Sequence, residues 1–230
     1  MMPRTAVILS ILLAWIAAAW AQSPPPGDRP ASSQPAAAPD STESMDPPMV
    51  GDHWTYDVRD EITGELKNAV THTVSDVTPT EIAVRVQNPA FGAAGVLIYD
   101  RSWNLKSSPD WSFSPSDGTG ITTPLAVGSS WKFQNDFIRR RYGFTFKNVG
   151  TSKVVGTERV TTDAGTFEAL KIETSINGRN ANDATKRFEQ TMTTWYVPSI
   201  DHWIKRTEKS AFNGRVQENV SWELVEYGRR

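Results

Sequence analysis

Residues 154–176 read VVGTERVTTDAGTFEALKIETSI and contain the clearest strand pattern of the sequence. In residues 170–176, apolar or Thr side chains at every second position alternate with charged or polar ones. An extended chain with this pattern has one apolar face and one wet face. Asp163-Ala164-Gly165 supplies turn-forming residues between residues 154–161 and 166–176. The stretch therefore predicts a hairpin of two antiparallel strands.

The same alternation recurs along the chain in residues 54–59, 82–87 and 220–225. No segment of helical length keeps an apolar stripe with the period of a helix. Glycine-containing pairs that favour short hairpin turns separate the strand-like runs: Thr63-Gly64, Asn177-Gly178 and Asn213-Gly214. Consecutive strands joined by hairpins pair antiparallel.

These patterns predict a single all-β domain of mainly antiparallel strands. A sheet with one apolar face must curl on itself or pack against a second sheet. We expect a strongly curved sheet or half-barrel, with a β-sandwich as the alternative.

The N-terminus has the pattern of a secretory signal peptide. Arg4 is the only charge before an apolar run from Ala6 to Ala19, and small residues lie at Ala19 and Ala21. We predict a signal peptide over residues 1–21, cleaved after Ala21, and hence a periplasmic or secreted protein. An uncleaved anchor is the alternative, but the run is shorter than the roughly 20 apolar residues of a membrane span.

Residues 22–47 are rich in Pro, Ala and Ser and have almost no large apolar side chain. Such a segment cannot bury enough surface to offset its conformational entropy. We therefore expect a disordered tether over residues 22–47, followed by the β-sheet domain over residues 48–228, which does not span a membrane after signal cleavage.

Charge and cysteine content exclude several classes of function. The chain has 24 basic and 26 acidic residues. Removing the signal peptide takes Arg4 and no acid, which leaves 23 against 26, a net charge of −3. This balance argues against a nucleic-acid partner. The sequence has no cysteine, so it has no disulfide and no thiol to carry a lipid anchor.

Residues for catalysis or metal binding are sparse. His53, His72 and His202 are far apart and follow no metal-ligand spacing. No Gly-x-Ser-x-Gly turn and no phosphate-binding loop is present. We therefore predict no catalytic residues, no metal site, no cofactor and no enzymatic activity.

The segment from Trp103 to Thr123 contains Trp103, Trp111 and Phe113 among closely spaced turn residues. Long loops in compact domains are often binding elements. We identify these three aromatic residues as candidate ligand-binding residues. The alternative is that they fill the open end of the sheet as part of the core.

Four ordered motifs in the second half resemble a known family: VGTE at residues 155–158, AGTFEALKI at 164–172, TWYVP at 194–198 and WIKR at 203–206. Together they resemble the TapB-like family of bacterial envelope proteins of unknown function. The resemblance implies a curved sheet similar to the half-barrel of lipoprotein carriers, which shield an acyl chain in an apolar concavity. It supplies no catalytic residues.

Two functions remain open at this point. The protein binds or shields a lipid or other apolar or amphipathic ligand in the concave face of its sheet, or it is a scaffold with a filled core that docks another envelope protein. An open apolar groove favours the first, and a filled interior with an exposed apolar patch favours the second.

Overall fold

The computed structural model describes residues 47–88, 92–122 and 125–229. The predicted signal peptide and residues 22–46 of the predicted tether lie outside these residues. The described residues form twelve strands: β1 (His53–Asp60), β2 (Leu66–Val77), β3 (Glu81–Asn88), β4 (Gly92–Asp100), β5 (Leu105–Ser107), β6 (Ser112–Ser114), β7 (Ser130–Arg139), β8 (Phe144–Thr162), β9 (Gly165–Asn180), β10 (Arg187–Val197), β11 (His202–Phe212) and β12 (Arg215–Gly228). Two short 3-10 helices are also present, η1 (Arg140–Tyr142) and η2 (Pro198–Ile200). In the described part of the chain, no helix has the length and apolar character needed to cross a membrane.

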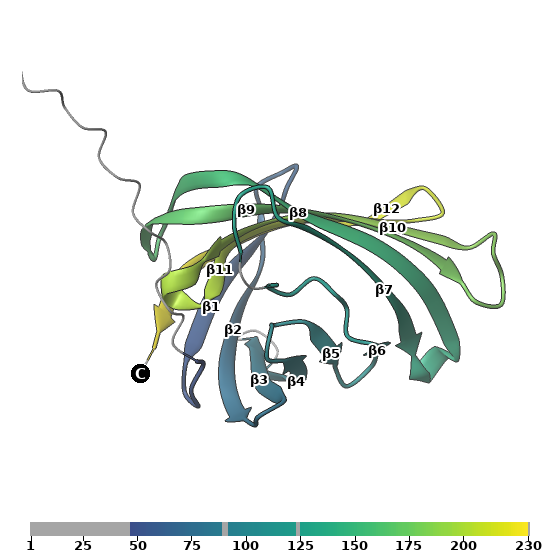
Figure 1. Cartoon of the computed structure of the whole chain (residues 1–230), viewed down its shortest axis with the longest axis horizontal. Helices are drawn as coiled ribbons and strands as arrows, with labels where there is room; N and C mark the ends of the chain where they lie inside the picture. The colour runs from purple at the N-terminus through teal and green to yellow at the C-terminus, as the bar shows by residue number, and fades with distance from the viewer. Residues whose placement is uncertain (1–46, 89–91, 123–124, 230) are drawn as a thin grey trace, which may run out of the picture. The chain divides into compact units, whose positions relative to one another are not determined.

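Each strand pairs antiparallel with the next, and β1 also pairs with β12, so the sheet closes into a barrel (Figure 1). The all-β, antiparallel prediction is confirmed. The prediction of a half-barrel, with a sandwich as the alternative, is wrong. The closing pairs include Tyr56 with Leu224 and Val58 with Trp222. Closure satisfies the backbone N–H and C=O groups that β1 and β12 would otherwise leave unpaired at two sheet edges.

Three of the four predicted turns are confirmed, and one is wrong. Residues 63–64, 163–164 and 213–214 lie between consecutive strands. Asn177-Gly178 instead lies inside β9, and the chain turns into β10 at residues 181–186. Gly178 faces Asn148 on the paired strand β8, and a Cβ at this position would lie 2.3 Å from Oδ1 of Asn148, so that side chain would have to move.

One end of the barrel is filled by side chains. Trp54 and Tyr56 of β1 and Ile204 of β11 are fully buried there. The Trp54 ring stacks on His202 with 4.1 Å between ring centroids. The Tyr56 hydroxyl donates a hydrogen bond of 2.9 Å to the backbone carbonyl of Trp203. Aromatic side chains thus hold β1 against β11 across the barrel interior.

The wall between β4 and β7 is built differently, because β5 and β6 have only three residues each. The loop after β6 completes this wall through its backbone. The N–H of Asp117 donates to the carbonyl of Leu105 at 2.8 Å, and the N–H of Ile121 donates to the carbonyl of Ser102 at 2.6 Å. The Asn135 amide of β7 donates to the carbonyl of Asp117 at 2.8 Å. This loop therefore lines the barrel interior.

Candidate ligand-binding cavity

The barrel interior contains a cavity of about 540 Å³ beside the filled end. Strands β2 to β5 and β9 to β12 surround it, together with the loop after β6. Four tryptophans and several aliphatic residues give it apolar walls: Trp103, Trp111, Trp203, Trp222, Val70, Val86, Leu97, Leu105, Ile121 and Ile172. This volume is within the range of about 300–1,000 Å³ that small-molecule sites occupy.

Two of the three predicted binding residues lie at this cavity. Trp103 and Trp111 line it, whereas Phe113 packs on Phe137 of β7, with 5.2 Å between ring centroids. Trp103 is also part of the filled end, where its ring meets Trp54 edge to face and its indole N–H donates to Asp201 at 3.2 Å. Trp103 thus has both of the roles considered from the sequence, core residue and cavity wall.

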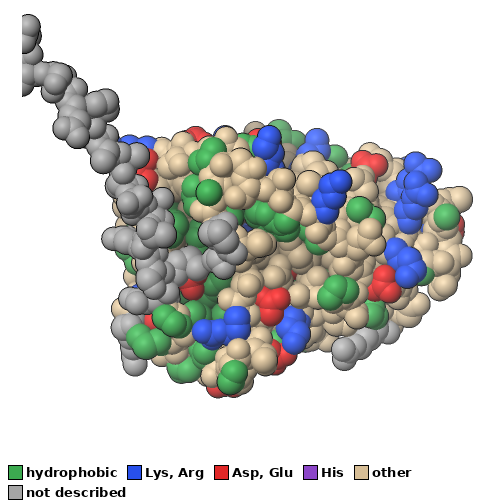
Figure 2. All heavy atoms as spheres, viewed as in Figure 1, with side chains coloured by type: hydrophobic (Ala, Val, Ile, Leu, Met, Phe, Trp, Pro, Cys, Tyr) green, Lys and Arg blue, Asp and Glu red, His purple; other side chains and the backbone are tan. Residues whose placement is uncertain are grey.

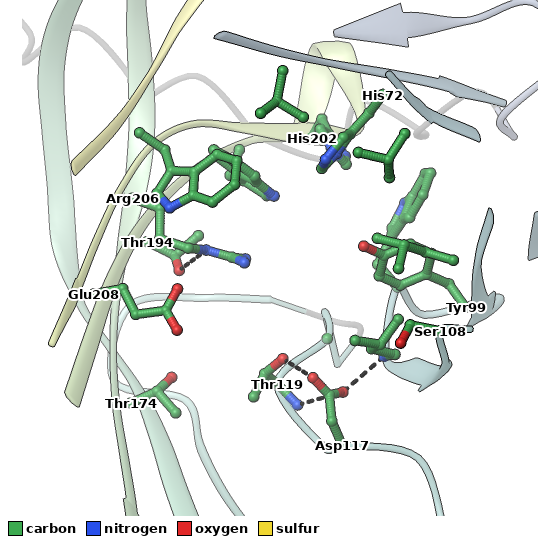
Figure 3. A pocket seen from close by; sticks show the side chains of 18 of the residues that line it. His72, Tyr99, Ser108, Asp117, Thr119, Thr174, Thr194, His202, Arg206 and Glu208 are labelled. Carbon is green, nitrogen blue, oxygen red and sulfur yellow. Dashed lines mark hydrogen bonds between the residues drawn. The ribbon is translucent and has the colours of Figure 1, made fainter. Parts of the chain in front are cut away.

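Polar side chains from several strands and loops also line the cavity. Figure 3 shows Arg206 and Glu208 on this strand, with Thr194 beside Arg206 and Asp117 on the opposite side. The Nε–H of Arg206 donates to the Thr194 hydroxyl at 3.2 Å, and its guanidinium carbon lies 4.6 Å from the centroid of the Trp203 ring. Glu208 accepts a hydrogen bond from the amide of Gln190. The cavity is therefore amphipathic, with apolar walls around a few charged groups.

Asp117 is held by three hydrogen bonds at the cavity wall (Figure 3). The N–H groups of Leu105 and Thr119 donate to its Oδ1 at 2.8 and 3.2 Å, and the Thr119 hydroxyl donates to Oδ2 at 2.6 Å. Burial still raises the pKa of this carboxyl group to about 6, because removal from water costs its charged form more than these donors return. Burial also raises the pKa of Glu208.

Two histidines lie where the cavity meets the filled end. Burial and, to a smaller extent, the positive charge of Arg206 lower the pKa of His72 to about 4. Burial lowers the pKa of His202 well below its usual value. Both imidazoles are therefore neutral at pH 7. Within residues 47–88, 92–122 and 125–229, no three His, Asp or Glu side chains are grouped as ligands for a metal ion.

Sequence reasoning missed Arg206, Glu208 and Asp117. The sequence pattern could have indicated Arg206 and Glu208, because they follow Ile204 at every second position and so lie on the same face of the strand. Charged residues that continue the face of a buried aliphatic residue indicate an interior polar site. Asp117 had no such signal, since it lies in a loop.

Comparison with known proteins adds support for the architecture. No protein-family model matches the sequence, and no curated protein matches it. A predicted lipoprotein from Parabacteroides distasonis has a similar structure, with a TM-score of 0.53 and 15% sequence identity over 80% of this chain and 98% of that chain. A predicted exported protein with a YmcC-like fold from Bacteroides fragilis has a TM-score of 0.49 and 14% identity over 80% and 99% of the two chains. The hypothetical lipoprotein YmcC from Escherichia coli has a TM-score of 0.48 and 9% identity over 78% and 86%.

At these identities the first likeness shows a shared fold and nothing more. The resemblance to the TapB-like family stays a prediction, since no family model matches the chain.

Proposed function

We propose that this protein binds an apolar or amphipathic small molecule inside its barrel, without catalysis, as an exported protein of the bacterial cell envelope. The predicted signal peptide supports export, and the motifs that resemble the TapB-like family support a place in the cell envelope. The ligand-binding part is based on the cavity.

The observation that carries the proposal is the 540 Å³ cavity with four tryptophans in its walls. Apolar walls exposed to water are unfavourable by roughly 25 cal/mol for each Å². A ligand that covers the indole rings removes this cost. Small-molecule sites in proteins commonly combine such walls with a few polar groups that fix the ligand's orientation.

A docking scaffold with a filled core is the other function considered from the sequence. Its interior would be occupied by side chains, and an apolar patch would face solvent. Figure 2 shows hydrophobic side chains interspersed with Lys, Arg, Asp and Glu on the face in view. The cavity favours ligand binding over this alternative.

The test is native mass spectrometry of the protein purified without detergent, followed by solvent extraction of bound molecules. We expect a stoichiometric small-molecule adduct or, if the adduct is lost during purification, saturable binding of the neutral fluorophore N-phenyl-1-naphthylamine. A ligand-free mass together with no fluorophore binding would contradict the proposal.

Leu97 and Val96 of β4 provide a matched pair of variants. Leu97 lines the cavity, whereas Val96 is 40% exposed on the outside of the barrel. Leu97→Trp fills part of the cavity and is expected to weaken fluorophore binding about tenfold, which corresponds to about 1.4 kcal/mol. Val96→Trp adds the same side chain outside and is expected to bind like the wild type. Equal binding by the two variants would place the ligand elsewhere.

A further inference from the structure

Arg206 brings a positive charge into the apolar part of the cavity. Its side chain extends from β11 toward the wall that carries Tyr99 (Figure 3). The guanidinium stacks on Trp203 and uses its Nε–H on Thr194. A guanidinium has five N–H donors. Among the described residues no other hydrogen bond and no ion pair engages Arg206, so its terminal nitrogens remain available to a ligand.

The nearby carboxylates do not neutralise this charge by direct contact. No carboxylate oxygen of the described residues lies within 4.0 Å of the Arg206 nitrogens. Asp117 is engaged by Leu105 and Thr119, and Glu208 by Gln190. Each of these two carboxylates thus has its own donors, while the guanidinium lacks a contacting anion.

A charge removed from water is costly unless it is paired and hydrogen-bonded. Arg206 is half-buried in a cavity whose other walls are largely apolar. A ligand with an anionic group would complete the coordination of the guanidinium, and planar guanidinium groups match carboxylate and phosphate oxygens with two parallel hydrogen bonds. Asp110 and Glu218, the remaining acidic residues of the cavity lining, are exposed to solvent, which screens their repulsion.

We propose that the cavity selects anionic amphiphiles, with the carboxylate or phosphate of the ligand bound to Arg206 and its apolar chain along the tryptophan walls. This inference depends on the proposed ligand-binding function and adds the chemical class of the ligand. Tyr99 is the second donor, on the opposite wall. Tyr99 is half-buried, its hydroxyl stays protonated because burial raises its pKa, and it makes no hydrogen bond with the described residues.

The test compares four decyl amphiphiles that share one chain: decanoate, decyl phosphate, decan-1-ol and decyltrimethylammonium. Displacement of N-phenyl-1-naphthylamine gives the affinity of each at pH 7.5. We expect at least one anion to bind about tenfold or more tightly than decan-1-ol, the gain typical of a charge-assisted hydrogen-bonded pair. The two anions also distinguish a carboxylate from a phosphate ligand.

Arg206→Met and Lys205→Met form the matched pair of variants. Lys205 is the neighbour of Arg206 in sequence, but it pairs with Glu223 at 2.6 Å outside the cavity. We expect Arg206→Met to lose the preference for anions while keeping the affinity for decan-1-ol within about threefold. Lys205→Met should keep the preference. Arg206→Lys serves if the methionine variant does not fold, and it should retain part of the preference through its point charge.

Three results would overturn the inference. Equal binding of decanoate, decyl phosphate and decan-1-ol by the wild type would leave the binding function standing and remove the anion selectivity. Tightest binding of decyltrimethylammonium would assign recognition to Asp117 and Glu208 instead. No binding of any amphiphile or of the fluorophore would remove the proposed function itself.

Discussion

The filled end and the cavity of the barrel interior both contain tryptophan, but they differ in how deeply they bury it. At the filled end, Trp54 and Tyr56 have no exposed surface and contact the rings of His202 and Trp203. At the cavity, Trp111 is only half-buried and faces an open volume. Tryptophan content alone therefore does not distinguish a core from a binding wall. The distinction comes from what lies opposite each ring.

The thin wall explains why the two parts differ. The filled end takes its buried side chains from β1, β2, β3 and β9 to β12, and these side chains meet across the interior. On the side of β5 and β6, each strand has only three residues, and a loop completes the wall through backbone hydrogen bonds. Fewer inward side chains come from such a wall, and the cavity results. The sequence left a filled core and an open groove as alternatives. The barrel contains both, in different parts of its interior.

The largest contrast should appear when tryptophan is truncated in each part. Trp54→Ala removes a fully buried ring and should lower the free energy of unfolding by about 3–5 kcal/mol. Trp111→Ala removes a ring that already faces open volume and should cost less than about 1 kcal/mol while weakening ligand binding. Urea unfolding measures the first effect and fluorophore titration the second. Similar losses of stability in the two variants would contradict the division of the interior.

Acid should destabilise the boundary between the two parts. The pKa of His72 is about 4 in the folded chain, below its usual 6.5, so the unfolded chain takes up its proton first as the pH falls. Stability from this group is present above pH 6.5 and is lost toward pH 4. The loss from pH 7 to pH 5 is about 2 kcal/mol. His202 adds a loss of the same sign, because its pKa is also lowered.

Urea unfolding at pH 7 and pH 5 measures this dependence. His72→Gln should reduce the difference in unfolding free energy between the two pH values by about 2 kcal/mol. His53→Gln is the control of opposite sign. The hydrogen bond from His53 to Glu226 raises the pKa of His53, so protonation stabilises the fold and removal of this group should increase sensitivity to acid. An unchanged pH dependence in His72→Gln would show that this imidazole is not desolvated.

Much of the fold follows from the sequence, because side-chain alternation and turn residues act locally. The pattern in residues 170–176 placed β9, and Asn213-Gly214 placed the last turn, with φ values of 49° and 75° that suit these residues. Closure did not follow, since pairing of β1 with β12 joins residues far apart in the chain. The turn predicted at Asn177-Gly178 was wrong because this glycine lies within β9, where it faces Asn148 of the neighbouring strand.

The site was harder to predict for a geometric reason. The register between β10 and β11 shifts at one point, where Trp195 pairs with Lys205 but Tyr196 pairs with Trp203. Ile204 is the extra residue, so Trp203 and Arg206 both line the cavity although they are three positions apart. Strict alternation would place them on opposite faces. The loop residues that complete the wall depend on backbone contacts that no local pattern reports.

The smallest predicted effect concerns the charge of Asp117 at the cavity wall. Its folded pKa of about 6 lies above its usual 3.8, so protonation between pH 7 and pH 5 stabilises the fold, opposite in sign to His72. Asp117→Asn keeps an acceptor for the N–H groups of Leu105 and Thr119 and should change stability at pH 7 by less than about 1 kcal/mol. It should also increase the loss of stability from pH 7 to pH 5 by about 1 kcal/mol.

Thr119→Val is the complementary variant, because it removes the hydroxyl that donates to Asp117 at 2.6 Å and should raise the pKa of Asp117 further. Urea unfolding between pH 5 and pH 8 should then show that protonation of Asp117 begins to stabilise the fold at a higher pH in this variant than in the wild type. If Asp117→Asn instead reduced sensitivity to acid, the carboxyl group would be charged and well solvated. The cavity wall would then be open to water at this loop, and the boundary with the filled end would lie deeper in the barrel.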